Sequence, residues 1–219
     1  PIIAHQGMGA FIIMVLFGLW TARDHLRDVA RKAFRGDDTI DDSDELLSYR
    51  VAVFGFLGCN MLMSVWLWMA GLVFWAVPVY LGAMYLMFLG VTRIVAEGGI
   101  AAARAPLIPS DFLHSAFGNT ALGPSSLTAL GFTFVWAADV RTFVMASVAN
   151  GLKLAEDQLA RRKRALFWAI GLAIVVSIAS SIWAVMYMSY SYGGINLNGW
   201  FFGPAGGPAY PFNFVTQEL

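Results

Sequence analysis

The sequence is short of charge and of the side chains that bind metals. Of its 219 residues only 13% are charged, whereas a soluble domain carries about a quarter. It has three histidines and one cysteine, so a disulfide framework or a Cys-pair zinc site within the chain is excluded. The single cysteine, Cys59, lies inside an apolar run and is expected to be a small packing residue.

Several sequence motifs that indicate a particular activity are also missing. The sequence contains no phosphate-binding P-loop, no dinucleotide glycine fingerprint and no haem-attachment motif. Ser125 and its neighbours do not match the nucleophile elbow of hydrolases. The net charge is zero, which provides no general attraction to nucleic acid. The sequence therefore predicts no cofactor, no catalytic residue and no nucleic-acid partner.

What the chain has in excess is apolar residues, which are 58% of the total and fall in long runs. About twenty apolar residues in a helix cross a hydrocarbon core of about 30 Å. Four such spans are predicted, at about 2–20, 51–69, 75–95 and 165–188. The predicted fold class is all-α, a polytopic transmembrane helical bundle forming one membrane domain over 1–219, with the lipid bilayer as its main partner.

The region 106–150 breaks this pattern. Proline or glycine recurs there at positions 106, 109, 118, 123 and 124. Short helices are expected instead of a regular span, at about 110–117, 125–136 and 141–159. The chain can make a re-entrant pair or two short spans here. Broken helices at membrane depth are tolerated only where protein buries them or where they line a cavity.

The remaining segments flank the spans. The first span is expected to continue into water as an amphipathic helix that ends at Gly36. The tail 189–219, rich in glycine, proline and aromatic residues, predicts an interfacial or extramembrane loop and no helix. The sequence starts at Pro1 inside an apolar segment without a basic flank, so no signal peptide is expected. Further helices of a longer parent chain, or other membrane subunits, are the expected partners.

The distribution of cations predicts the orientation in the membrane. Segment 21–50 carries six Lys and Arg residues and segment 153–164 carries five. By the positive-inside rule both face the cytoplasm, which predicts the orientation of a multi-pass membrane protein. The acidic residues between 37 and 45 lack the spacing of a calcium loop and are read as a solvated loop.

The polar stretch 93–104 supplies the first candidate site residues. Arg93 and Glu97 are four residues apart and share one side of a helix, and Arg104 lies seven beyond Glu97. One interpretation is an interfacial ion pair whose arginines reach towards water. The other is a proton or cation site at Glu97 with arginines that hold an anion.

The broken region supplies the rest. Asp111 and His114 are three residues apart, which could orient two metal ligands or a proton relay, but no third ligand is specified. Helix capping with a polar packing contact is therefore the favoured interpretation. Asn119, Ser125 and Ser126 lie among helix breakers, where helix N-termini can face an anionic group; a surface loop is the alternative. The candidate substrate-binding residues are Glu97, Arg104, Asp111, His114, Asn119, Ser125 and Ser126, with no metal site predicted.

Two sequence segments carry a family resemblance. The run HQGMGAFIIMVLFGLWTARDHLRDVARKAF is followed by TRIVAEGGI and then by the helix-broken segment. Together they resemble a group of large uncharacterised bacterial membrane proteins, which are similar in turn to the oligopeptide-transporter superfamily. The resemblance covers most of the chain. It implies many transmembrane helices and transport, and assigns no substrate and no site residue.

Two functions follow as predictions. The first is a transporter-like solute permease, or part of one, in which the broken region 106–128 lines a midplane site beside Glu97 and Arg104. The second is a non-catalytic membrane subunit of a larger complex, suggested by the aromatic tail and the many methionines and tryptophans. A membrane enzyme comes third, supported only by the Asp111 and His114 pair.

Overall fold

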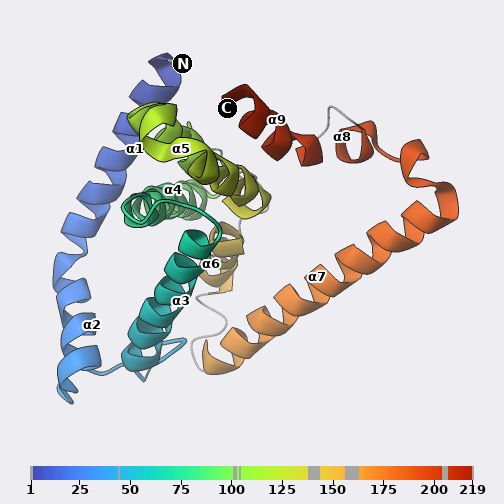
Figure 1. The fold of residues 1–219 in the computed structure, drawn as a ribbon. Coiled ribbons are helices and arrows are strands. Elements are labelled where there is room, and N and C mark those ends of the chain that lie inside the picture. Colours follow the sequence, from blue (N-terminus) through green and yellow to red (C-terminus); the bar gives the residue numbers. More distant parts are fainter. Residues whose placement is uncertain are drawn as a thin grey trace.

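A computed structural model describes residues 2–43, 45–100, 103, 105–137, 144–155, 163–203 and 207–218. In these ranges every regular element is a helix, which confirms the predicted all-α class (Figure 1). The longer helices are α1 (Ile2–Thr21), α2 (Arg23–Arg35), α3 (Tyr49–Met69), α4 (Ala76–Gly98), α5 (Pro109–Ala137), α6 (Val144–Ala155), α7 (Lys163–Tyr192) and α9 (Tyr210–Glu218). Short turns of helix follow α7, namely η2 (Gly194–Asn196), α8 (Gly199–Phe202) and η3 (Gly207–Ala209).

Among the residues that the structure describes, four helices are long and apolar enough to cross a membrane. They are α1, α3, α4 and the part of α7 from Ala165 to Tyr192. These are the four spans that apolar run length predicted, and their ends differ from the prediction by only a few residues. The chain is therefore built as an integral membrane protein.

Helix α4 lies at the centre of the bundle and contacts α1, α3, α5 and α6. Half of its apolar window is buried, compared with 17% for α1 and 6% for α3. Its first half, with Tyr80 and Met84, joins α3, α5 and α9 in one apolar cluster. Its second half, with Met87 and Val91, joins α1 and α6 in another. The apolar sequence of α4 is thus matched by protein on several sides.

Close helix packing occurs at a glycine that the sequence did not single out. Gly55 and Gly58 of α3 and Gly82 of α4 face open space, because a Cβ on any of them would meet nothing within 4 Å. The contact is made instead at Gly90 of α4, where the ring of Phe11 fills the place of the missing side chain. Spacing along one helix does not reveal which side a neighbouring helix will occupy.

The first span does continue as the predicted amphipathic helix. Backbone hydrogen bonds run through Ala22 with almost no interruption, from Ala22 N to Gly18 O and from Leu26 N to Ala22 O. The helix ends at Gly36, whose φ is 67° and whose N–H donates to Lys32 O. Glycine suits this left-handed capping position, as the sequence predicted. Helix α2 then packs against the start of α3.

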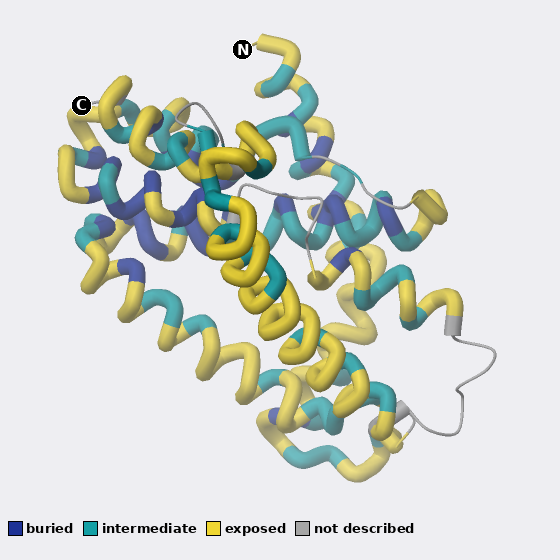
Figure 2. Tube along the Cα trace, turned by 90° about the vertical axis from the view of Figure 1, so that its right-hand side faces the viewer, coloured by how far each residue is buried: buried dark blue, intermediate teal, exposed yellow. Residues whose placement is uncertain are grey.

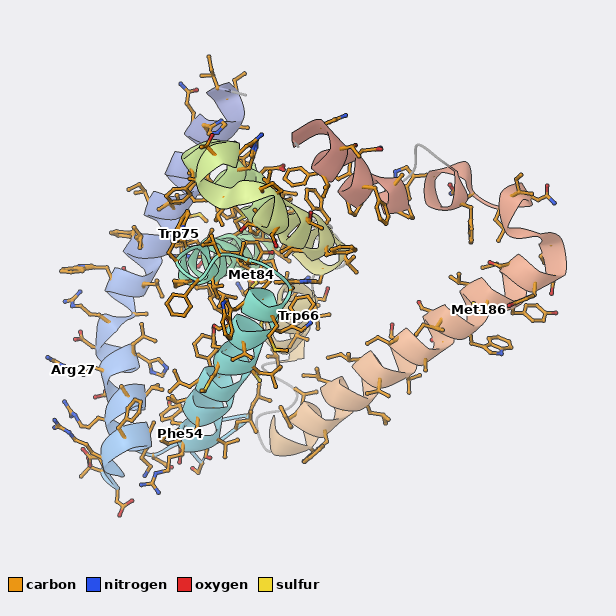
Figure 3. All side chains as sticks on the ribbon, viewed as in Figure 1. Arg27, Phe54, Trp66, Trp75, Met84 and Met186 are labelled. Carbon is orange, nitrogen blue, oxygen red and sulfur yellow. The ribbon has the colours of Figure 1, made fainter. Side chains whose placement is uncertain are left out.

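Helix α7 stands apart from the bundle. None of its apolar window is buried, and Figure 2 shows it exposed along most of its length. Figure 3 contrasts Met84, which lies within the bundle, with Met186, which lies on the isolated α7. An apolar helix of this length is stable in such a position only where lipid or other helices surround it.

The tail corrects one prediction. Residues 189–219 were expected to form a loop without helix, but the tail contains α9, a helix of nine residues. Proline and glycine break the tail at its start, whereas Phe214 gives α9 a buried anchor that is only 7% exposed. The packing of this side chain against α5, which composition does not reveal, explains why helix forms here.

Candidate functional site

The centre of interest is α5, which is broken at two glycines. Gly118 has φ 73° and ψ 169°, and Gly123 has φ 74° and ψ 163°. This backbone region is essentially restricted to glycine, because a Cβ would collide with the chain. The breaks fall where the sequence predicted them and divide α5 into a first limb, 109–117, a tip, 118–123, and a second limb, 124–137.

The two limbs fold back on each other to form a hairpin. Ser110 Oγ lies 2.7 Å from Thr133 Oγ1, although the residues are 23 apart in the chain. On one straight helix that separation would be about 34 Å. The two ends of the α5 hairpin therefore lie close together, as both predicted alternatives, a re-entrant pair and two short spans, require.

The parts of the two limbs next to the tip are fastened to the turn between α3 and α4. Ser126 Oγ accepts a hydrogen bond from Val73 N at 3.1 Å and donates to Gly71 O at 3.4 Å. Gly71 has φ 108°, and a Cβ there would meet Ser125 Oγ at 2.5 Å. The ring of Trp75 at the start of α4 stacks edgewise on Phe117 at 4.8 Å. Ser125 and Ser126 thus have a visible structural role in this joint.

Between the limbs and α4 lies a small buried group of oxygens, which we call the hydroxyl cluster: Tyr80, Ser110, Thr133 and the carbonyl of Leu130. Ser110 and Thr133 are at most 1% exposed and Tyr80 is fully buried. Thr133 Oγ1 donates to Leu130 O at 2.6 Å, and Ser110 Oγ lies 3.4 Å from the same carbonyl. The Tyr80 hydroxyl interacts with both side chains, yet it makes no hydrogen bond of normal geometry.

Two candidate residues meet beside the tip. His114 Nε2 and Asn119 Oδ1 form a hydrogen bond that bridges the first limb and the tip. The ring of His114 also packs edgewise on Phe214 of α9. Asn119 is exposed, while Asp111 and His114 are half-buried on the first limb. The sequence pattern allowed a metal or relay pair of His114 with Asp111. The structure pairs His114 with Asn119.

Helix α9 braces the second limb. A Cβ at Gly131 would lie 2.6 Å from Val215 Cγ2 and 3.2 Å from Pro211 O. Phe214 packs on Phe134 at 5.0 Å between ring centres as well as on His114. The tail thus contacts both limbs of the hairpin.

The other candidate residues lie at the far end of α4. Arg93 Nε donates to Glu97 Oε1 at 2.8 Å, which confirms the pairing expected from their spacing. The guanidinium of Arg93 occupies the space beside Gly18 of α1. Lys153 Nζ of α6 donates to Ala96 O at 2.8 Å. A cation suits the carbonyl end of a helix, so Arg93 and Lys153 tie three helices together at this end.

The structure therefore separates the predicted site residues into two groups. Asp111, His114, Asn119, Ser125 and Ser126 all belong to the hairpin, whose tip lies beside the residues that precede α4. Glu97 lies at the other end of α4, a helix of 23 residues and hence about 34 Å long. Arg104 lies outside the described residues. A single small solute cannot touch both groups at once.

Three residues of interest were not predicted from the sequence. Tyr80 and Thr133 are isolated polar positions in apolar runs, and Lys153 opens a basic segment. Polar groups at membrane depth are costly unless they have a partner or a use, which was the available signal. Within the described ranges, no three His, Cys, Asp or Glu residues are grouped to hold a metal ion.

Comparisons with known proteins place the chain in a family without assigning an activity. No curated protein matches the sequence, and no solved structure matches the fold. One family matches residues 1–216, and it is described as a family of unknown function, DUF6785. Since this match covers nearly the whole chain, the protein belongs to the DUF6785 family.

Proposed function

We propose that the chain forms part of a solute permease of a bacterial inner membrane, with the α5 hairpin beside the transport pathway. The hairpin is the observation that carries the proposal. Its glycine breaks interrupt backbone hydrogen bonding next to a membrane-spanning helix. Such breaks suit discontinuous helices that bind solutes or ions in transporters. The resemblance to the oligopeptide-transporter superfamily points to the same class.

Two contacts support the proposed orientation. Lys153 belongs to segment 153–164, which the positive-inside rule assigns to the cytoplasm, and it contacts Ala96 at one end of α4. Ser126 and Val73 meet at the other end, so the hairpin tip shares the outer side with the turn between α3 and α4. Both ends of the hairpin would then lead back to the cytoplasmic side, and its tip, with the exposed Asn119, would lie nearest to the outer surface.

Solute uptake tests the proposal directly. Proteoliposomes containing the full-length protein are offered a panel of di- and tripeptides, amino acids and small organic anions. We expect uptake of at least one solute class, and a loss of at least tenfold in Asn119→Ala. Asn213→Ala, at an exposed position of α9, is the matched control and should keep normal uptake. Absence of all uptake, or equal uptake by the two variants, would contradict the proposal.

One observation favours a second candidate, a non-catalytic subunit of a larger membrane complex. Helix α7 exposes its whole apolar window, and neighbouring subunits could cover it as well as lipid. Purification in a mild detergent followed by native mass spectrometry separates the two functions. Stoichiometric co-purifying membrane proteins together with absent uptake support the subunit, whereas a single species that transports a solute supports the permease.

A further inference from the structure

We propose that the hydroxyl cluster of Tyr80, Ser110, Thr133 and the Leu130 carbonyl is a binding site for a monovalent cation, Na⁺. The site lies where both limbs of the hairpin meet α4. This deepens the proposed permease function, because it names an ion that would act at the hairpin. The binding itself is measured without any transport.

The buried hydroxyl of Tyr80 has unused hydrogen-bonding capacity. Tyr80 is fully buried, and although its hydroxyl lies near enough to interact with Ser110 and Thr133, it has no hydrogen-bond partner of normal geometry. A buried polar group without a partner is costly, and most such groups find an ion, a water molecule or another side chain. A bound species between these oxygens would satisfy the lone pairs of Tyr80.

The oxygens of the hydroxyl cluster are close enough together to surround one ion. The separations among Ser110 Oγ, Thr133 Oγ1 and Leu130 O are 2.6, 2.7 and 3.4 Å. Ions with metal–oxygen distances of about 2.4 Å have neighbouring ligand oxygens about 3 Å apart. Hydroxyl hydrogens rotate freely, so they can turn outward and present lone pairs to a cation after a shift of a few tenths of an ångström.

The absence of charge on the ligands favours a monovalent cation. Every ligand in the cluster is neutral, whereas Ca²⁺ and Mg²⁺ sites are built around carboxylates. Neutral carbonyl oxygens are the ligands with which channels coordinate monovalent cations. No described group of three carboxylate, histidine or cysteine side chains lies elsewhere in the fold to hold a divalent ion. A small, hard, monovalent cation therefore fits the donor set best.

The position of the cluster suggests what the ion would do. Ser110 belongs to the first limb, Thr133 to the second, and Tyr80 to the central helix. An ion bound to all three would hold the hairpin closed on α4. Its loss would release three contacts at once, which couples the ion to the position of the hairpin.

Thermal unfolding of the full-length protein in detergent tests the site. Unfolding is compared in NaCl, KCl and choline chloride at equal ionic strength. At an Na⁺ concentration about ten times its Kd, we expect Na⁺ to raise the Tm by roughly 3–6 °C over choline. Thr133→Val keeps the side-chain shape, removes one ligand and should abolish the shift. Thr128→Val is the matched control, since the Thr128 hydroxyl only donates to Pro124 O in its own limb, and it should retain the shift.

A second variant, Tyr80→Phe, keeps the test valid if Thr133→Val fails to fold. Tyr80→Phe removes only the hydroxyl, and its binding of ²²Na⁺ is measured directly beside that of wild type; we expect at least a tenfold loss. A wild type without an Na⁺-specific shift would overturn the site, as would Na⁺ binding that survives in both variants. Variants that change Tm equally in all three salts indicate a buried water and also overturn it. Na⁺ binding that follows our expectation in a protein without uptake would overturn the permease alone.

Discussion

At the scale of single residues, glycine has two opposite environments within α4. Gly90 is buried and receives the ring of Phe11, whereas Gly82 is exposed and a Cβ there would meet nothing within 4 Å. A missing side chain at Gly90 thus allows α1 to approach α4. At Gly82 it provides no contact.

Alanine at these two positions should therefore have opposite effects. Gly90→Ala forces the Phe11 ring aside, and overpacking of this kind costs about 1–3 kcal/mol. Gly82→Ala adds a methyl group in open space and gains helix propensity, so its stability should be unchanged or slightly higher. Thermal unfolding of both variants in detergent measures the difference. Equal Tm values for the two would contradict the proposed packing of α1 on α4.

The ion pair of Arg93 and Glu97 belongs to the same scale. Glu97 is largely exposed, with 63% of its side chain accessible. Pairs four residues apart on an exposed helix contribute only about 0.3–0.5 kcal/mol. The pair alone therefore does not explain why a carboxylate is placed at the end of a membrane span.

Glu97→Gln should consequently leave thermal stability almost unchanged, within about 2 °C of wild type. The informative measurement is uptake of the solute found in proteoliposomes. Normal uptake supports the interfacial ion pair, and lost uptake with normal stability assigns Glu97 to the pathway. A large loss of stability would contradict both interpretations, because it would require a buried role for the carboxylate.

At the scale of elements, the α5 hairpin depends on two glycines and three attachments. Gly118 and Gly123 provide the backbone reversal, and Ser126 joins the start of the second limb to the turn before α4. The hydroxyl cluster joins the limbs, and α9 braces them through Phe214. Each attachment comes from a segment distant in the sequence.

Gly118→Ala should strain this hairpin. The observed φ of 73° and ψ of 169° cost about 1–3 kcal/mol for a residue with a Cβ. Gly58→Ala is the control, because Gly58 lies in regular helix and faces open space. Hydrogen exchange should show faster exchange in the hairpin amides of Gly118→Ala and no change in the control. Unaltered hairpin exchange in Gly118→Ala would argue against the reversal at this residue.

At the scale of the whole molecule, the protein is a bundle around α4 with an outlying α7 (Figure 1). The two ends of α4 differ in character. One end gathers the charged side chains of Arg93, Glu97 and Lys153, and the other gathers the hairpin tip and the turn before α4. The orientation proposed from the distribution of cations would put the charged end on the cytoplasmic side.

Cysteine labelling checks that orientation. Single cysteines are placed at Thr39, Phe74 and Leu62 in a Cys59→Ser background. In intact cells an impermeant thiol reagent should label Phe74→Cys, and it should reach Thr39→Cys only after permeabilisation. Leu62 is 72% exposed in a predicted span, so lipid should shield Leu62→Cys under both conditions. The reverse pattern for Thr39→Cys and Phe74→Cys would invert the topology.

Apolar run length by itself determined the class of this protein and its four long helices, because a span must satisfy its own backbone hydrogen bonds within one segment. Glycine and proline likewise predicted where α5 breaks, since their backbone preferences are local. The pairing of Arg93 with Glu97 was predictable for the same reason.

Only the tertiary structure decided which polar residues meet. It brought Tyr80 to Ser110 and Thr133, joined Lys153 to α4, and separated Glu97 from Ser126 by the length of a helix. Gly90 is a site of close helix packing in the structure, whereas Gly55 and Gly58 are not. Part of the tail forms a helix that packs against α5. These outcomes depend on which sides of the helices face each other, and that is set by contacts between segments far apart in the chain, which spacing within one segment does not specify.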